Sequence, residues 1–157
     1  MAIDRGITLT NHATDALILV EGDPDRLQQV LLALLDNALK HTPSGGHVSL
    51  SVQQQGGDAT VQVSDDGEGI AAEHLPRIFD RFYRVDRARS RAHGGTGLGL
   101  SIARSLVTAH GGQLAIDSDL GQGTIVTIRL RVSSQAPTLV GKLEHLAARM
   151  AHRTSDE

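Results

Sequence analysis

The sequence predicts an α/β (α+β) two-layer sandwich, in which a mixed, mainly antiparallel sheet of about five strands carries three helices on one face. Two observations favour this fold class. Residues 24–42 and 97–110 repeat their apolar side chains at helical spacing. Each of these helices is followed by two segments in which apolar and polar residues alternate, as they do in a half-buried β-hairpin.

The composition is that of one globular domain. The chain has 157 residues, of which 39% are apolar, so it can bury a core without help from a metal or a disulfide. It has no cysteine, which excludes disulfides and thiolate metal sites and permits a cytosolic location. The formal charge of −3 provides no overall basic field, and no apolar run is long enough to span a bilayer. We therefore expect no nucleic-acid partner and no direct membrane contact by this segment.

The N-terminal part predicts strands followed by a capped helix. Residues 7–20 place apolar side chains around a polar centre, which suggests two short strands joined by a turn. Asp23 can cap the next helix, and Pro24 suits its first position because that residue needs no amide hydrogen. We expect this helix to run to about Thr42, just before a proline.

The first helix has a polar flank beside its apolar face. At about 100° per residue, Ala33, Asn37 and Lys40 fall in one row along that flank. His41 lies between this row and the leucines of the apolar face. The helix is therefore expected to bury its leucines on a sheet and to present its flank to a polar partner.

The middle of the chain predicts a hairpin and a glycine-rich turn. Residues 47–65 alternate apolar and polar side chains on either side of a QGGD turn. The segment DDGEGI follows, and a short helix is expected around Glu73 to Phe82. Residues 84–96 lack apolar periodicity and predict a mobile loop.

A second helix and a last hairpin complete the domain. Thr96 can cap the helix, and a glycine pair marks its end. The apolar face of the helix is predicted to consist of Leu98, Ile102 and Leu106. The final hairpin turns at GQGT, and we place the domain at residues 1–133. Residues 134–157 are expected to form a linker and an amphipathic tail helix that packs or frays and does not bind a ligand.

Two glycine-rich segments could hold a nucleotide. GGTGLGL, residues 94–100, precedes a helix whose amides could face phosphate, but Leu100 breaks a dinucleotide pattern and no P-loop lysine follows. Within DDGEGI, residues 65–70, the Asp65 carboxylate could accept the amino group of adenine. Either segment could equally be a structural turn.

The polar side chains also leave alternatives open. Asn37 is either a solvated flank residue or an oxygen ligand of Mg²⁺. The arginines near position 80 form a solvated helix face or neutralise a triphosphate; they are Arg77, Arg81, Arg84 and Arg87. No histidine is assigned to a metal, and His110 is attributed to the dipole at a helix C-terminus.

Taken together, these motifs resemble the catalytic ATP-binding domain of sensor histidine kinases, a branch of the GHKL ATPase superfamily. LLDNALKHTP is similar to the N box, SDDGEGI to the first glycine box and IFDRFYRVD to the F box of that family. GGTGLGL resembles its second glycine box, and GQGTIVTIRL its closing strand turn. The resemblance runs from about Ile7 to Val132 and implies the Bergerat ATP-binding fold.

The resemblance implies roles for individual residues. Asn37 would hold a Mg²⁺ ion that bridges the phosphates of ATP, and Lys40 would contact a phosphate, so these two carry the catalytic assignment. His41 would pack beside the adenine, where relatives often have an aromatic residue, and Asp65 would bind the adenine amino group. The remaining cofactor-binding residues would shape the pocket floor, the lid and the adenine end; they are Gly67, Gly69, Ile70, Arg84, Gly95, Thr96, Gly97, Leu98, Gly99, Leu100 and Thr124.

Two departures from the family pattern affect the functional prediction. Ala33 occupies a position where relatives usually have an asparagine that orients or activates the nucleophile, which puts full activity in doubt. The phosphate-accepting histidine motif is absent, so we expect a fragment of a longer kinase in the cytoplasm, with the parent free or anchored in the inner membrane. Its implied partners are a histidine-bearing dimerisation domain and a response regulator. The alternatives are a non-catalytic ATP-sensing module and an anti-sigma-factor serine kinase of the same superfamily.

Overall fold

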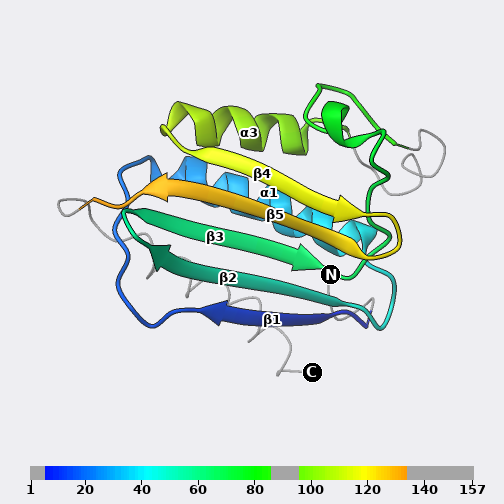
Figure 1. The fold of residues 1–157 in the computed structure, drawn as a ribbon, viewed down its shortest axis with the longest axis horizontal. Coiled ribbons are helices and arrows are strands. Elements are labelled where there is room, and N and C mark those ends of the chain that lie inside the picture. The colour runs from blue at the N-terminus through cyan, green and yellow to red at the C-terminus, as the bar shows by residue number, and fades with distance from the viewer. Residues whose placement is uncertain (1–5, 86–95, 134–157) are drawn as a thin grey trace.

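The computed structural model describes residues 6–85 and 96–133 (Figure 1). Five strands form one sheet in the order β1-β2-β3-β5-β4. Their bounds are Thr8–Ala13, His47–Gln55, Asp58–Asp65, Gln113–Asp119 and Gly123–Arg131 for β1 to β5. Only the β1–β2 pair is parallel, so the sheet is mixed and mainly antiparallel, as predicted.

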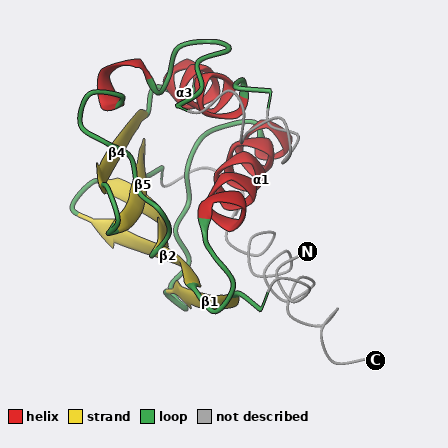
Figure 2. Cartoon of the chain, turned by 90° about the vertical axis from the view of Figure 1, so that its right-hand side faces the viewer, coloured by secondary structure: helices red, strands yellow, loops and turns green. Residues whose placement is uncertain are grey.

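The helices cover one face of this sheet. Figure 2 shows α1 and α3 together on one side, which confirms the predicted two-layer arrangement. Helix α1 spans Pro24–His41 and helix α3 spans Gly99–Ala109. The third helix of the described residues is only a 3-10 turn, η2, at Leu75–Arg77. None of the described helices has the length and apolar character of a bilayer-spanning segment.

Helix α1 begins and ends where the sequence predicts. The Asp23 carboxylate accepts hydrogen bonds from the amides of Asp25 and Arg26, at 2.9 and 3.1 Å. Two otherwise unpaired amides of the first turn are thereby satisfied. At the other end, the Thr42 hydroxyl donates to the Ala38 carbonyl at 2.7 Å. The Thr42 amide donates to the same carbonyl at 3.0 Å, and the side-chain bond gives the hydroxyl of the buried Thr42 a partner.

The core lies between α1, α3 and the inner face of the sheet. The most deeply buried large side chains come from both layers: Val30, Leu34, Val48, Val63 and Val107. In β2 the buried residues alternate with more exposed ones, whereas β3 buries Ala59, Thr60 and Val63. Leu50 of β2 lies opposite Val63 of β3 in the register. Each such side chain contributes about 1.5–3 kcal/mol through removal from water. This burial fixes the orientation of α1 on the sheet.

His110 joins the two helices through a neutral ring. Its Nδ1 atom donates to the Leu106 carbonyl at 2.7 Å, and its Nε2 atom accepts from the Asp23 amide at 3.0 Å. An imidazole that donates from one nitrogen and accepts at the other carries no charge. The bond to Leu106 places a ring donor on a carbonyl of the last turn of α3, which is the kind of contact that the attribution of His110 to the helix C-terminus implies.

Two local predictions, one near the chain start and one in the η2 region, are also corrected. Residues 7–20 form one strand, β1, and then only an isolated bridge from Val20 to Val132. The strand ends where the Thr14 hydroxyl accepts a hydrogen bond from the Ala16 amide, because this local turn replaces pairing with a neighbouring strand. The helix predicted for residues 73–82 is a single turn, because the amides of Asp80 and Tyr83 form further turns beyond it.

Helix α3 differs from the prediction in its start and in its buried face. It begins at Gly99 after Leu98, and no side chain caps it, so Thr96 is not the N-cap. The residues buried against its neighbours are Ser101, Ala103 and Val107, whereas Ile102 is 40% exposed. Small residues on the inner side let α3 pack against α1. Of the predicted apolar face only Ile102 turns outward, since Leu98 and Leu106 are partly buried and Leu106 packs against the core. Of the mobile loop predicted for residues 84–96, residues 86–95 lie outside the described residues, and so do the linker and tail helix predicted for residues 134–157.

Candidate functional site

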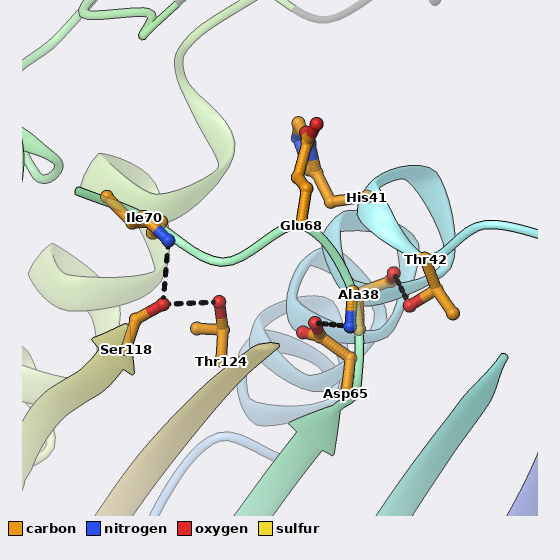
Figure 3. Close-up of polar contacts among 9 residues, drawn as sticks. Ala38, His41, Thr42, Asp65, Glu68, Ile70, Ser118 and Thr124 are labelled. Carbon is orange, nitrogen blue, oxygen red and sulfur yellow. Dashed lines mark hydrogen bonds and ion pairs between the residues drawn. The ribbon is translucent and has the colours of Figure 1, made fainter. Parts of the chain in front are cut away.

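The end of α1 and the glycine segment after β3 meet at one edge of the sheet. The Glu68 amide donates to the carbonyl of His41, the last residue of α1, at 3.2 Å. Figure 3 shows His41 and Glu68 side by side, with Asp65 close to the last turn of α1. The structure therefore brings together two segments whose residues the sequence assigns to one nucleotide site.

Asp65 places a partly desolvated carboxylate at this edge. It is the last residue of β3, and its Oδ1 atom accepts from the Gly67 amide at 3.0 Å. Burial raises the pKa of Asp65, while the amides of Gly67 and Thr124 and the nearby His41 act in the opposite direction. The carboxylate keeps free acceptor capacity, so it can bind a group that offers hydrogen-bond donors.

Gly67 and Gly69 allow the backbone to pass close to its neighbours. A Cβ atom on Gly67 would collide with the His41 carbonyl oxygen, and one on Gly69 would collide with the Asp119 carbonyl. Gly69 also has a φ of +65°, which favours glycine. Between them, the Glu68 carbonyl accepts from the Gly121 amide at 2.8 Å. The glycines thus hold this segment between α1 and the β4–β5 turn.

Thr124 lies directly beside Asp65. The two residues are register partners on β5 and β3, and Thr124 is buried. Its hydroxyl lies 2.9 Å from that of Ser118, which also accepts from the Ile70 amide at 2.9 Å (Figure 3). Ser118 was not among the predicted site residues. The sequence could have indicated it, because Ser118 falls on the same face of the predicted strand as Leu114 and Ile116, where a polar side chain needs a hydrogen-bond partner.

The flank of α1 carries the predicted polar groups. Ala33 and Asn37 are both partly exposed, and no hydrogen bond joins the Asn37 side chain to another described residue. Lys40 pairs with Asp36 at 2.6 Å, and His41 Nδ1 pairs with Glu68 Oε1 at 2.6 Å. Because these pairs are well exposed to solvent, each is worth only a fraction of a kcal/mol and can yield to a stronger partner.

The lid region is described at its two ends. The Phe82 amide donates to the Gly97 carbonyl at 2.9 Å, so the end of the F box contacts the second glycine segment. Arg84 has a buried Nη2 atom without a hydrogen-bond partner. Thr96 and Gly99 are exposed, while Leu98 and Leu100 are partly buried. Arg87 and Gly95 lie outside the described residues.

The donor set constrains how a metal could bind. Over residues 6–85 and 96–133, no three His, Cys, Asp or Glu side chains converge on one point. The described residues therefore offer no site in which three such side chains hold a metal. A Mg²⁺ ion with one amide ligand, Asn37, would need phosphate oxygens and waters for the rest of its octahedron, which is a usual arrangement for this ion.

An apolar cavity lies away from this site. It is bounded by the first half of α1, by Ile18 and Val20, and by the opposite ends of β3 and β5 from Asp65 and Thr124. In addition to Ile18 and Val20, the residues that line it are Leu27, Val30, Leu31, Val52, Ala59, Val61, Ile128 and Leu130. Such a lining offers no group to recognise phosphate or a base, so we assign it to the core.

A family model supplies the identification. The model described as histidine kinase-, DNA gyrase B- and HSP90-like ATPase matches residues 22–134, which include α1, both glycine segments and the β4–β5 hairpin. The chain belongs to this ATPase family. The match confirms the resemblance inferred from the motifs, and it identifies the fold as that of the ATPase domains of histidine kinases.

Similar proteins are sensor histidine kinases that are much longer. The chain is 43% identical over 132 residues to sensor histidine kinase WalK of Bacillus subtilis strain 168, covering 83% of this chain and 22% of WalK. It is 46% identical over 112 residues to sensor histidine kinase YkoH of the same strain, covering 71% of this chain and 24% of YkoH. The chain therefore spans about a quarter or less of these relatives.

Solved structures support the same family. The mycobacterial sensor histidine kinase MprB has a TM-score of 0.71 at 32% sequence identity, covering 83% of this chain and 86% of that one. Full-length ShkA in complex with AMPPNP has a TM-score of 0.73 at 31% identity, covering 87% of this chain and 28% of ShkA. The described fold is thus that of a histidine kinase ATPase domain.

Proposed function

We propose that this domain binds Mg·ATP and, within a full-length sensor kinase, donates the γ-phosphate to a histidine of a dimerisation domain, for relay to an aspartate of a response regulator. The observation that carries the proposal is the partly buried Asp65 carboxylate, held at the junction of β3, α1 and β5. An acceptor in that setting suits the exocyclic amino group of adenine. The ShkA structure, which contains AMPPNP, supports adenine nucleotide binding by this fold.

The polar flank of α1 would serve the phosphates. Asn37 would supply an amide oxygen to a Mg²⁺ ion, whose charge would offset that of the phosphates. Lys40 exchanges its exposed Asp36 partner for a phosphate oxygen, which is a better acceptor. Arg84 has an unpaired buried nitrogen that a phosphate could satisfy on lid closure. Catalysis would come chiefly from positioning and charge neutralisation.

The remaining features of the proposal concern the parent protein. The partner domains belong to the part of a sensor kinase that this chain does not include, since its relatives are several times longer. We place the domain in the cytoplasm, where ATP and response regulators are found. His41 packs at the edge of the base, after its Glu68 contact is rearranged.

One observation favours a second function, a non-catalytic ATP-sensing module. Ala33 lies on the same flank as Asn37 and presents a methyl group where the relatives' pattern has an amide. A methyl group can neither orient nor activate a nucleophile. In that case nucleotide binding would change lid order and partner contacts without phosphoryl transfer.

A nucleotide titration tests the binding site before any question of transfer. ATP and GTP would be titrated by calorimetry into the 157-residue chain, each with and without Mg²⁺. We expect ATP to bind more tightly than GTP, and Mg²⁺ to strengthen ATP binding because Asn37 would hold the ion beside the phosphates. Equal affinity for ATP and GTP would count against the role of Asp65. No binding of either nucleotide would overturn the proposal.

A further inference from the structure

Ser118 connects three parts of the chain at the edge of the site. It lies at the end of β4, is 8% exposed, and is not part of any of the nucleotide-binding motifs recognised in the sequence. Its Oγ atom accepts from the Ile70 amide at 2.9 Å and donates to the Gly123 carbonyl at 2.7 Å. The same atom lies 2.9 Å from Thr124 Oγ1, as Figure 3 shows.

The direction of the Ser118–Thr124 hydrogen bond follows from counting protons. A serine hydroxyl has one proton and two acceptor positions. The Gly123 carbonyl can only accept, so the Ser118 proton lies on that bond. The Ile70 amide can only donate, and it takes one acceptor position of Ser118. Thr124 must therefore be the donor in the remaining bond, with its own proton directed at Ser118.

This direction determines what Thr124 offers to a ligand. With its proton committed to Ser118, the Thr124 oxygen has only acceptor positions left. Its register partner Asp65 is also an acceptor when ionised. Two acceptors side by side match a ligand edge that carries donors, such as a 6-amino purine or a bridging water. A 6-oxo purine would place a third acceptor against them, which leaves buried polar groups unpaired.

We infer that Ser118 is a positioning residue that sets base selectivity, because it makes Thr124 a hydrogen-bond acceptor beside Asp65. This inference rests on the proposed nucleotide site and adds to it a residue that contacts no part of the nucleotide. It also explains why a hydroxyl is buried at the end of β4 next to the glycine segment: Ile70, Gly123 and Thr124 all depend on it.

The test compares ATP with inosine triphosphate, which has a 6-oxo group. Affinities of both would be measured by calorimetry on the full chain for the wild type, Ser118→Ala and the control Thr60→Val. Thr60 is another buried hydroxyl, at the opposite end of β3. In Ser118→Ala the Thr124 proton is free to turn toward the ligand, so the preference for ATP should fall about fivefold to tenfold. Thr60→Val should keep the wild-type preference.

Variants of Thr124 make the test independent of how well Ser118→Ala folds. Thr124→Ser keeps the hydroxyl and should retain the preference for ATP, whereas Thr124→Val should lose it. Adding Ser118→Ala to Thr124→Val should change the ratio no further if Ser118 acts through Thr124. A folded Ser118→Ala protein with the wild-type ratio would overturn the inference, as would Thr124→Val with that ratio. Failure of the wild type to bind ATP would instead overturn the proposed function.

Discussion

At the scale of single residues, neighbouring carboxylates in one glycine-rich segment serve different ends. Asp65 is partly buried and its pKa is raised, chiefly by desolvation. Asp66 is exposed, and hydrogen bonds from the His47 amide and ring hold its pKa below the ordinary value. Asp65 is thus a poorly solvated acceptor suited to a ligand, whereas Asp66 ties the segment to the start of β2.

The first prediction concerns Asp65→Asn. The pKa of Asp65 is higher in the native state than in the unfolded state. At pH values between these two pKa values the native state binds more protons than the unfolded state, so the free energy of unfolding falls as pH rises through this range. Asp65→Asn should remove this fall, so it should become more stable relative to the wild type as pH rises. It should also weaken the preference for ATP over GTP by about tenfold or more. Urea unfolding across pH 3 to 8, roughly the range in which carboxylates titrate, would show the trend.

Asp66→Asn is the matched control for that experiment, and it has the opposite sign. A lowered native pKa contributes stability that is present above the ordinary aspartate value and is lost as pH falls through the native pKa. Asp66→Asn should therefore be less stable than the wild type at neutral pH, and this difference should vanish in acid. The same pH trend in both variants would contradict the contrast between the two sites.

The second prediction compares two glycines. Gly67→Ala brings a methyl group against the His41 carbonyl, which belongs to the helix backbone and cannot easily move. It should lower the free energy of unfolding by about 1–3 kcal/mol. Gly57→Ala meets only the flexible end of Arg131 at 3.3 Å, and should change stability by about 0.5 kcal/mol or less. Equal urea midpoints for the two variants would show that the close approach at Gly67 is absent in solution.

At the scale of elements, the site depends on how α1 is placed on the sheet. The helix is fixed at its start by Asp23 and His110 and at its end by Thr42. Its apolar face packs on β2 and β3, and its last carbonyl meets the glycine segment. Asn37 and Lys40 are therefore carried by a helix whose two ends are both tied to other elements.

The third prediction tests the start of α1. Asp23→Ala removes two side-chain hydrogen bonds to amides of the first turn, and it should lower the free energy of unfolding by about 1 kcal/mol. Asp15→Ala is a suitable control, since Asp15 is exposed in the preceding loop, and it should change stability by about 0.5 kcal/mol or less. Chemical denaturation of both variants checks this. Equal losses would indicate a general charge effect and no specific cap.

At the scale of the whole molecule, the two ends of the sheet lie in different environments, one polar and one apolar. The ends of β3 and β5 that carry Asp65 and Thr124 meet the polar end of α1, while their other ends meet its apolar first half. The polar site therefore rests on a core that does not need to move for nucleotide binding. The described segments on either side of residues 86–95 contact each other through the Phe82 amide and the Gly97 carbonyl.

The fourth prediction addresses activity in the presence of a partner. With a separately supplied histidine-bearing domain and labelled ATP, Ala33→Asn should raise phosphoryl transfer about tenfold or more if the missing amide limits the chemistry. Ala33→Leu, of similar size and without an amide, should give no gain. Acid-labile label on the partner would identify phosphohistidine. Tight ATP binding without transfer by either protein would favour the ATP-sensing module.

Much of this molecule followed from the sequence, because the signals were local. The apolar spacing, the Asp23–Pro24 start and the alternating strands predicted α1 and both hairpins, since these depend on neighbours along the chain. The glycine segments and the N-box residues together predicted the ATPase family. The roles of the individual site residues in binding remain predictions.

Contacts between distant segments were decided only by the tertiary structure. The neutral ring of His110, the outward turn of Ile102 and the junction at Ser118 depend on the packing of α3 and β4 against elements far away in the sequence. The spacing of apolar residues and the helix or strand propensity of each residue carry no information on such contacts, because these hydrogen bonds form only after distant segments have packed together. The sequence by itself determined α1, the two hairpins and the family, whereas packing decided which side chain donates to which.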